Sequence, residues 1–316
     1  MKIVLLESLA ISNEVLENYK TKLENMGHEF LSYERNLDTE VLIERSKDAD
    51  ILMIANMPLK GEVIRACKNL KYINIAFTGV DHVDLEACKE MGIEVSNASG
   101  YSTESVAELA LCMMISLLRN VAKVDERCRE GKTKDGLVGF ELMGKTVGIV
   151  GIGKIGLRTA ELLNAFGCKI IAYNHREKEV PEFVKLVSLD ELLEKSDIIS
   201  LHCPLNASTK GLIGKEEIAK MKKSAILINT ARGAVVDSAA LADALNNGDI
   251  LGAGIDVFET EPPLDTAHPL LSAKNTLVTP HIAFATKESM LLRAEIVFDV
   301  LDAYLKGERK NVILSS

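Results

Sequence analysis

A glycine-rich turn in the middle of the chain has the residue types and spacing that bind a dinucleotide. The segment VGIVGIGKIG is an apolar run with glycines at the spacing G-x-G-x-x-G, and it opens a helical pattern. The first glycine permits the tight bend, the second lets the backbone approach a pyrophosphate, and the third allows close helix–strand packing. The free N–H groups at the helix start then face the phosphates. The predicted contacts are Gly151, Gly153, Lys154, Ile155 and Gly156.

The residue expected to bind the ribose in such a site is an asparagine in this chain. The fingerprint places an acid about 20 residues after the turn, where it bonds the ribose 2′-hydroxyl. The second strand ends in IIAYNHRE, with Asn174 at that position and His175 and Arg176 after it. Asparagine bonds a hydroxyl without repelling a 2′-phosphate, and Arg176 either pairs with such a phosphate or is a solvated loop residue. We therefore predict NAD(H) or NADP(H) as cofactor, with NADP(H) slightly favoured.

Length and composition describe an ordinary soluble globular protein of about two domains. The 316 residues are 47% hydrophobic and 26% charged, with a net charge of −9. A net acidic chain argues against nucleic acid or an anionic membrane as a partner. The N-terminus is a poor signal peptide, and no apolar run has the length of about 18 residues that a membrane span needs. Six scattered cysteines without a C-x-x-C pair predict free thiols and a cytoplasmic protein.

Two α/β units are predicted, one before and one after a long apolar helix at residues 102–121. Apolar runs that alternate with helical patterns imply parallel sheets with helices on their faces. The runs in the first unit lie at 2–7, 49–55 and 71–77, and those in the second at 145–150, 169–174, 196–203, 225–231 and 251–258. Because the long helix is apolar on most faces, it is predicted to lie in a core or in a subunit interface, and both alternatives stay open.

The motifs together resemble the D-isomer-specific 2-hydroxyacid dehydrogenase family over essentially the whole chain. The stretches that carry the resemblance, in chain order, are FTGVDHVDL, GIGKIG, INTARGAVVDSAAL, DVFETEP and TPHIAFAT. The resemblance implies an α/β fold of two Rossmann-like, doubly wound parallel-sheet domains, with the cofactor domain inserted into the substrate domain. The expected substrate (catalytic) domain is 1–98 plus 287–316, and the expected dinucleotide-binding domain is 99–286. The active site is expected in the cleft between them.

The resemblance also implies a catalytic triad. Arg232 of TARG resembles the arginine that binds the substrate carboxylate and carbonyl oxygen, for which a planar, always-charged fork is suited. His281 of TPHIA resembles the acid/base that exchanges a proton with the carbonyl oxygen, because imidazole titrates near neutrality. Glu261 of ETEP resembles the carboxylate that orients this histidine. Taken singly, each residue has an ordinary structural explanation; their occurrence together in family order favours the triad.

Further contacts carry over from the family to matching positions of this chain. The implied substrate contacts are Thr78 and Gly79 of FTGVD, Met57 in the loop NMPLK, and Phe284 of HIAFAT. The implied cofactor contacts beyond the glycine turn and the ribose segment are Cys203, Pro204, Thr209, Thr230, Ala231 and Asp256. No metal site is expected, because His202 and Cys203 have no further ligands at suitable spacing.

The favoured function is reversible hydride transfer between NAD(P)H and a small 2-oxo acid or D-2-hydroxy acid. Formate dehydrogenases of the superfamily have glutamine where Glu261 stands, so the glutamate indicates hydroxy-acid chemistry. HIAFAT resembles the HIAWA of glycerate dehydrogenases and hydroxypyruvate reductases, with Phe284 in place of tryptophan, and this favours hydroxypyruvate or glyoxylate. The alternatives are a D-lactate or branched D-2-hydroxy acid dehydrogenase and, from another class, an NAD(H)-sensing co-repressor-like binding protein. The family suggests a homodimer through the region of the helix after Ser102.

Overall fold

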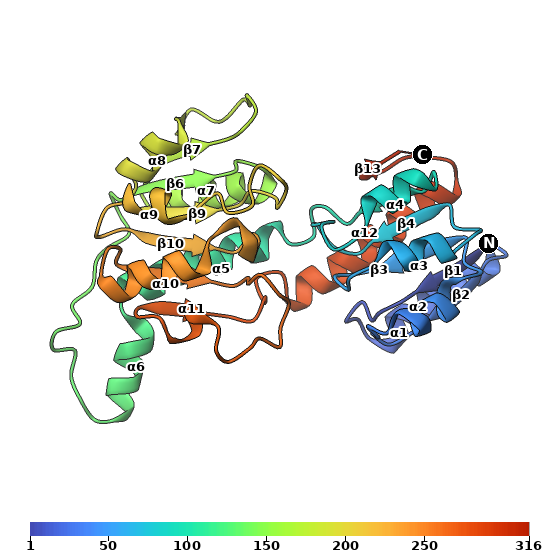
Figure 1. Cartoon of the computed structure of the whole chain (residues 1–316), viewed down its shortest axis with the longest axis horizontal. Coiled ribbons are helices and arrows are strands. Elements are labelled where there is room, and N and C mark those ends of the chain that lie inside the picture. The colour runs from blue at the N-terminus through green and yellow to red at the C-terminus, as the bar shows by residue number, and fades with distance from the viewer. Residues whose placement is uncertain (316) are drawn as a thin grey trace. The chain divides into compact units, whose positions relative to one another are not determined.

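The computed structural model describes residues 1–315, which fold into two compact units (Figure 1). Unit 1 comprises Met1–Ser102 and the segment that begins at Ala285, and unit 2 comprises Thr103–Phe284. Unit 1 is therefore discontinuous in sequence, because the chain leaves it after residue 102 and returns at residue 285. The borders expected from the sequence, at residues 98 and 287, lie a few residues away.

The sheet of unit 1 is parallel except for one edge strand. Its strand order is β13-β5-β4-β3-β1-β2, and β13 pairs with β5 in the antiparallel direction. The strands are β1 (Lys2–Leu5), β2 (Glu29–Ser32), β3 (Ile51–Ile54), β4 (Tyr72–Ile75), β5 (Glu94–Asn97) and β13 (Val312–Leu314). Strands β1, β3 and β4 lie within predicted apolar runs. The parallel part has the order 2-1-3-4-5 of flavodoxin-like sheets.

Helices from both chain segments of unit 1 cover its sheet. They are α1 (Asn13–Asn25), α2 (Thr39–Ser46), α3 (Gly61–Ala66), α4 (Leu85–Glu90) and α12 (Lys287–Leu305). Helix α1 begins after Ser12, whose hydroxyl accepts a hydrogen bond from the N–H of Val15 at 3.3 Å. The C-terminal helix α12 packs on the same sheet. Its Phe298 stacks on Tyr19 with ring centroids 3.9 Å apart, and the amide of Asn74 donates to the carbonyl of Val297.

The sheet of unit 2 is parallel and has the strand order of dinucleotide-binding folds. The order β12-β11-β10-β9-β6-β7-β8 reverses between β6 and β9, as in the 3-2-1-4-5-6 arrangement. The strands are β6 (Thr146–Val150), β7 (Lys169–Tyr173), β8 (Val184–Leu186), β9 (Ile198–Leu201), β10 (Ile226–Asn229), β11 (Gly252–Ile255) and β12 (Thr276–Val278). Successive residues of β10 point to opposite faces of the sheet. Leu227 belongs to the buried cluster that includes Leu241, and Ile228 belongs to the one that includes Met113. The prediction of two doubly wound α/β domains is confirmed.

The long apolar helix after Ser102 lies mainly in the core of unit 2. The helices of this unit are α5 (Thr103–Leu118), α6 (Val121–Arg129), α7 (Lys154–Ala165), α8 (Leu189–Lys195), α9 (Lys215–Ala219), the 3₁₀ helix η1 (Gly233–Val235), α10 (Ser238–Asn247) and α11 (Pro269–Ser272). Helix α5 packs against α7, β10 and β11 and buries Met113 and Met114. Helix α6 has no buried residue, and with the loop after it projects from the rest of the unit (Figure 1).

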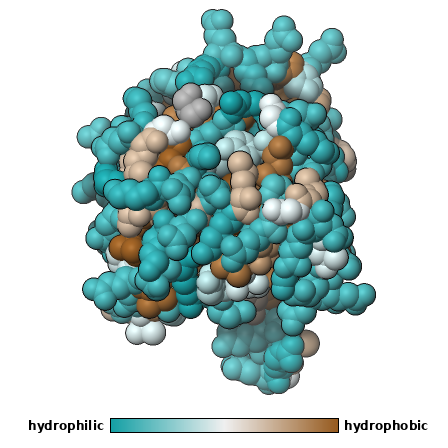
Figure 2. All heavy atoms as spheres, turned by 90° about the vertical axis from the view of Figure 1, so that its right-hand side faces the viewer, coloured by the Kyte–Doolittle hydropathy of each residue, from teal (hydrophilic) through white to brown (hydrophobic). Residues whose placement is uncertain are grey.

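Apolar surface is limited on the face of the molecule that Figure 2 shows. Hydrophilic side chains dominate this face, and the hydrophobic ones are scattered among them (Figure 2). Within residues 1–315 no single helix is long and apolar enough to span a membrane. The pair α5 and α6, bent by 61°, reaches the required length and apolar content only when the two helices are counted together.

Candidate active site and dinucleotide site

Loops at the carboxyl ends of three neighbouring strands of unit 2 carry the predicted triad. Arg232 follows β10, Glu261 lies in the segment after β11, and His281 follows β12. These strands are adjacent and parallel, so their carboxyl ends meet at one edge of the sheet. This edge is where open α/β sheets place their functional residues.

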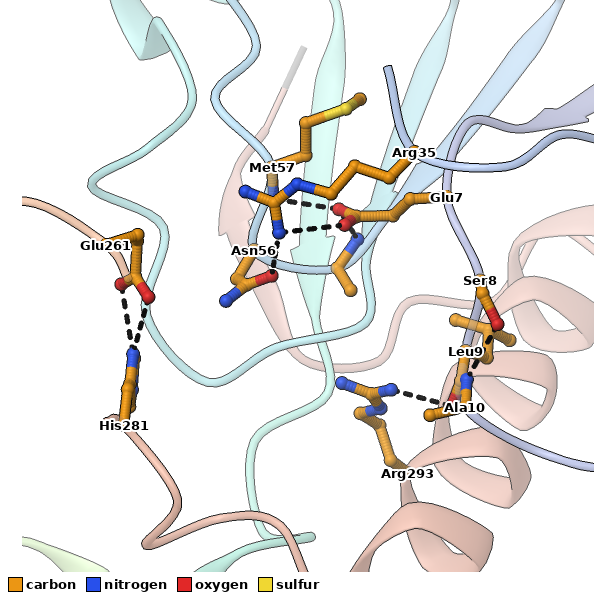
Figure 3. A network of polar contacts seen from close by, with 11 residues as sticks. Glu7, Ser8, Leu9, Ala10, Arg35, Asn56, Met57, Glu261, His281 and Arg293 are labelled. Carbon is orange, nitrogen blue, oxygen red and sulfur yellow. Dashed lines mark hydrogen bonds and ion pairs between the residues drawn. The ribbon is translucent and has the colours of Figure 1, made fainter. Parts of the chain in front are cut away.

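His281 and Glu261 form a directly paired imidazole and carboxylate (Figure 3). The carboxylate oxygens of Glu261 lie 3.0 and 2.8 Å from Nδ1 of His281. An ionised carboxylate only accepts hydrogen bonds, so we assign the ring proton to Nδ1. Nε2 is then the nitrogen that can exchange a proton with a ligand. The imidazole is shielded, with 9% of the side chain exposed, whereas the Glu261 side chain is 41% exposed.

A buried aspartate holds the loop that carries His281. Asp256 is fully buried, and its carboxylate accepts hydrogen bonds from the N–H groups of Ile282 and Ala283 at 2.8 and 2.9 Å. It also accepts one from the hydroxyl of Thr279 at 2.6 Å. His281 has a φ of +58°, which is uncommon outside glycine, and its N–H donates to the carbonyl of Asp256 at 2.8 Å. Asp256, predicted as a cofactor contact, thus has its carboxylate engaged in fixing the strained turn at His281.

Phe284 and the backbone next to Arg232 complete the surroundings of the triad. The ring of Phe284 stands edge-on to that of His281, with centroids 5.1 Å apart and planes at 86°. Nη1 of Arg232 donates to the carbonyl of Ala231 at 2.8 Å, which holds the guanidinium to its own loop. A Cβ on Gly233 would lie 1.9 Å from the carbonyl carbon of Phe258. Glycine at this position therefore lets the TARG loop lie directly against the segment that leads to Glu261.

Each glycine of the turn after β6 has a separate structural reason. Gly151 has a φ of +92°, and a Cβ there would lie 2.8 Å from the backbone nitrogen of Cys203. A Cβ on Gly156 would lie 2.2 Å from the carbonyl oxygen of Gly151, so the helix could not pack as closely. A Cβ on Gly153 would meet nothing within 4 Å, which leaves open space where the pyrophosphate of a dinucleotide fits. Gly153 is also the N-cap of α7 and supplies no side chain to the N–H groups there.

A pocket of about 560 Å³ adjoins this turn. The predicted cofactor residues that line it are Gly151, Asn174, His175, Arg176, Cys203, Pro204 and Thr209. Five other lining residues were not predicted as contacts. Val150 and Tyr173 end β6 and β7, and Asn206, Ser208 and Leu212 lie in an irregular loop after β9 that carries no periodic pattern. The Asn174 amide donates to the carbonyl of Arg176 at 2.7 Å, and the Lys178 ammonium donates to the carbonyl of Ile152 at 2.7 Å. Lys178 therefore places an additional cation next to the glycine turn.

The inner wall near β9 and β10 is uncharged and contains an unpaired hydroxyl. Burial lowers the pKa of His202 to about 4, and Nε2 of this ring lies 2.9 Å from the hydroxyl of Ser200. Burial raises the pKa of the Cys203 thiol to about 11. Both groups are therefore neutral at pH 7. The buried hydroxyl of Thr230 has no hydrogen-bond partner among the described residues, which fits a site completed by a polar ligand.

The predicted substrate residues of unit 1 differ in their accessibility. Thr78 and Gly79 are partly exposed, and the carbonyl of Thr78 accepts a hydrogen bond from the Asn97 amide at 2.6 Å. Asn97 thus holds this loop, although its position inside the strand sequence EVSN indicated no such role. Met57 was predicted to line the pocket, but its side chain is 0% exposed. In the same loop Asn56 is partly exposed, and Pro58 and Lys60 are exposed.

Comparison with known proteins agrees with the fold and with these motifs. The family model described as "D-isomer specific 2-hydroxyacid dehydrogenase, NAD binding domain" matches residues 111–283. The hydroxypyruvate reductase of Blautia hydrogenotrophica is 38% identical over 324 residues, which cover 99% of each chain. The glycerate dehydrogenase of Methylorubrum extorquens is 39% identical over 298 residues, which cover 92% of this chain and 93% of the relative. The solved structure of an acyclic imino acid reductase in complex with NADPH and D-Arg has a TM-score of 0.91 and 31% identity, covering 99% of this chain and 100% of that one.

The fold and the glycine turn define a two-domain α/β protein with a dinucleotide-binding domain. The chain belongs to the D-isomer specific 2-hydroxyacid dehydrogenase family. The family resemblance seen in the sequence is confirmed, and so is the prediction of a nicotinamide cofactor.

Proposed function

We propose that the protein reduces small 2-oxo acids to D-2-hydroxy acids and catalyses the reverse oxidation, with hydroxypyruvate or glyoxylate as the favoured substrate. The observation that carries this proposal is the pairing of His281 with Glu261 on the same sheet edge as Arg232. When bound, the nicotinamide cofactor supplies or accepts the hydride. The residues of this chain bind the acid and move the proton.

Each member of the triad has a separate task in this proposal. Arg232 donates paired hydrogen bonds to the carboxylate and the carbonyl oxygen of a 2-oxo acid, which polarises the carbonyl. Nε2 of His281 gives a proton to that oxygen during reduction and removes it during oxidation. Glu261 fixes the proton on Nδ1 and stabilises the protonated ring. We further propose that Thr78, Gly79 and Phe284 contact the substrate, and that the buried Met57 supports the loop on which Asn56 lies.

Cofactor binding is assigned to the residues around the glycine turn and the adjoining pocket. The proposed contacts are Gly151, Gly153, Lys154, Ile155, Gly156, Asn174, His175, Arg176, Cys203, Pro204, Thr209, Thr230, Ala231 and Asp256. We propose a preference for NADP(H) because Asn174 brings no negative charge to the ribose position. The guanidinium of Arg176 and the ammonium of Lys178 add positive charge to the same region. The relative with the TM-score of 0.91 was solved with NADPH.

The Asn174→Asp variant is expected to shift the preference toward NAD(H). A carboxylate at this position bonds a ribose 2′-hydroxyl and repels a 2′-phosphate. The ratio of kcat/KM with NADPH to that with NADH should fall by about tenfold, which corresponds to about 1.4 kcal/mol. Asn164→Asp, on the exposed side of α7, is a control with the same change of charge. If Asn174→Asp leaves the NADPH/NADH ratio unchanged, this position does not distinguish the two cofactors.

A panel of 2-oxo acids with NADH and NADPH, followed at the nicotinamide absorbance, tests the proposed activity. The expected result is turnover of hydroxypyruvate or glyoxylate above that of pyruvate and branched 2-oxo acids. Higher turnover of pyruvate or a branched acid would instead identify a D-lactate or branched D-2-hydroxy acid dehydrogenase. Tight cofactor binding without turnover of any acid would contradict the enzyme proposal and favour the co-repressor-like alternative.

We further propose that the protein is a homodimer whose interface includes the surface beside α5. Apolar side chains are exposed there, with Val138 at 78%, Phe140 at 49%, Met143 at 73% and Phe166 at 45%. Four large apolar side chains exposed on one surface are typical of a protein–protein interface. In analytical ultracentrifugation the wild type should sediment as a dimer, and the Met143→Glu variant should sediment as a monomer. A monomeric wild type would contradict the proposed homodimer.

Localisation in the cytoplasm is proposed from the cysteines. All six are free thiols in the described part of the chain, as is usual in a reducing compartment.

A further inference from the structure

An irregular segment of unit 2, between β11 and α11, carries Glu261. Residues 259–267 form no helix or strand, and most of their side chains are exposed. Surface segments of this kind sample several conformations unless other contacts fix them. Glu261 nevertheless holds Nδ1 of His281 closely, with its two carboxylate oxygens at 3.0 and 2.8 Å (Figure 3). The segment therefore needs contacts that restrict it.

A hydrogen bond between two side chains joins the ends of this segment. Nε2 of His268 lies 3.0 Å from Oε2 of Glu259, so the residues before and after Glu261 are tied together. Nδ1 of His268 accepts a hydrogen bond from the N–H of Leu270 at 3.3 Å, which assigns the ring proton to Nε2. The histidine therefore donates to the carboxylate while it is neutral. We call this contact the Glu259–His268 clamp.

The Glu259 end of the clamp is an ionised carboxylate that is also tied to a core helix. Burial raises the pKa of Glu259, but hydrogen bonds from Ser238 and His268 outweigh this effect, so the pKa lies below its usual value. Ser238 is the first residue of α10 and is buried. The bond from Ser238 therefore connects this end of the segment to the framework of unit 2.

The His268 end of the clamp is shielded by an aromatic ring. The His268 side chain is 15% exposed, and its ring stands edge-on to that of Phe258, with centroids 5.1 Å apart and planes at 85°. Phe258 is itself buried, and its backbone lies against Gly233 of the TARG loop. Both ends of the segment are thus fixed within unit 2, on the same side of the sheet edge that carries the triad.

We propose that the Glu259–His268 clamp is a positioning device that keeps the carboxylate of Glu261 on Nδ1 of His281. Its effect on catalysis rests on the proposed reductase activity, in which Nε2 of His281 exchanges the proton. Without the clamp the segment spreads over several conformations, and only a fraction of the molecules keeps Glu261 in place. Proton transfer slows with that fraction, whereas binding of the acid by Arg232 does not depend on it.

Three variants separate the clamp from the other contacts of its two residues. His268→Asn keeps a side-chain acceptor for the N–H of Leu270, because asparagine is a good N-cap, but its shorter side chain loses the bond to Glu259. Glu259→Ala removes the clamp from the other side, and Glu259→Gln retains an oxygen for the N–H of His268.

The clamp should act on kcat and leave KM nearly unchanged. For the 2-oxo acid that the wild type reduces best, kcat should fall by about tenfold in His268→Asn and in Glu259→Ala. Glu259→Gln should restore most of the wild-type kcat. In all three variants KM for the acid, and cofactor affinity measured by fluorescence titration, should remain within a small factor of the wild type.

A second measurement follows the proton of His281 and needs no turnover. In heteronuclear NMR spectra of the imidazole groups, the Nδ1–H of His281 should give a downfield proton resonance, because a carboxylate accepts this proton and the ring is shielded from water. Its absence in His281→Ala assigns the resonance. It should broaden or disappear in His268→Asn and in Glu259→Ala, and it should persist in Glu259→Gln.

A double variant and a matched control distinguish positioning of Glu261 from a general structural role. Adding Glu259→Ala to Glu261→Gln should lower kcat little beyond the effect of Glu261→Gln alone, because the clamp acts through Glu261. Glu191→Ala removes a carboxylate that accepts a hydrogen bond from Lys195 at 2.8 Å on α8. This control should keep the wild-type kcat and the His281 resonance.

The outcomes distinguish the clamp from the activity on which its catalytic effect rests. If the wild type reduces a 2-oxo acid, and both His268→Asn and Glu259→Ala keep kcat and the resonance, the clamp proposal is wrong and the proposed function stands. A rise in KM as large as the fall in kcat, or losses that add fully in the double variant, would also overturn positioning through Glu261. If the wild type reduces no 2-oxo acid, the proposed function fails and the resonance alone decides: its loss in His268→Asn supports the clamp, and its persistence there overturns it.

Discussion

The His281→Ala variant should lower kcat by about 10²- to 10⁴-fold, which is the usual contribution of a positioned acid/base. The structure supports this role because Nδ1 of His281 is held by Glu261 at 2.8 Å. Nε2 is thereby left as the nitrogen that exchanges the proton. Alanine cannot donate to the carbonyl oxygen, so the alkoxide that forms during reduction would have to take its proton from water. Cofactor affinity should change little.

Steady-state kinetics at saturating substrate and cofactor, together with a cofactor binding titration, measure the two quantities separately. His28→Ala is the matched control, because this ring contacts the N-terminal amine of unit 1 and lies outside the site. The control should keep wild-type kcat. Near-normal turnover of His281→Ala would remove His281 from the proposed mechanism, and another group would have to supply the proton.

The fold was predictable from the sequence wherever the local pattern is strong. The runs KIVLLE and ADILMIA contain β1 and β3, and VGIVGIGKIG contains the end of β6, the turn and the start of α7. Strands β2 and β5 were not predicted, because polar residues interrupt the apolar pattern in EFLS and EVSN. Glu94 in β5 is nevertheless buried, and its carboxylate pairs with the guanidinium of Arg309. Because the partner of this buried carboxylate lies so far away in the sequence, the local hydrophobic pattern around Glu94 gives no indication that the residue is buried in a strand.

The candidate site was predictable where function requires a particular residue type. Glycine at 151, 153 and 156 follows from backbone conformation and close approach, and these requirements can be read from spacing alone. The supporting residues could not be found in this way. The carboxylate of Asp256 holds the His281 loop across more than twenty residues of sequence, and that of Glu7 holds the turn at Asn56 across nearly fifty. Such pairs form only when parallel strands bring their carboxyl ends together.

The Met57 prediction shows a related limit of reading a loop from its composition. A methionine in a loop near a site is a reasonable pocket wall, because its side chain is flexible and apolar. In this turn the two N–H groups bonded to Glu7 fix the backbone, and the methionine side chain is buried. The direction of a side chain in a tight turn depends on the backbone conformation, which its residue type does not specify.

The Arg232→Ala variant should lower kcat/KM for the 2-oxo acid by about 10²- to 10⁴-fold. Two charge-assisted hydrogen bonds to the substrate would be lost, each contributing about 1.5 to 3 kcal/mol. Both KM and kcat should deteriorate, because the arginine binds the carboxylate in the ground state and stabilises the carbonyl oxygen as negative charge develops on it. Cofactor affinity measured by titration should remain within a small factor of the wild type.

Arg232→Lys distinguishes the geometry of this group from its charge. Lysine keeps the positive charge but has no planar fork. Compared with Arg232→Ala, Arg232→Lys should therefore bring KM part of the way back to the wild-type value and should restore kcat to a smaller extent. Arg129→Ala removes an exposed arginine that pairs with Asp125 on α6, and it controls for the loss of a cation from unit 2. If Arg232→Lys restores full kcat, charge alone accounts for the role of Arg232, and paired recognition of the acid is wrong. If Arg232→Ala itself keeps wild-type KM and kcat, the substrate carboxylate is bound elsewhere, and the sheet edge with His281 supplies only the proton.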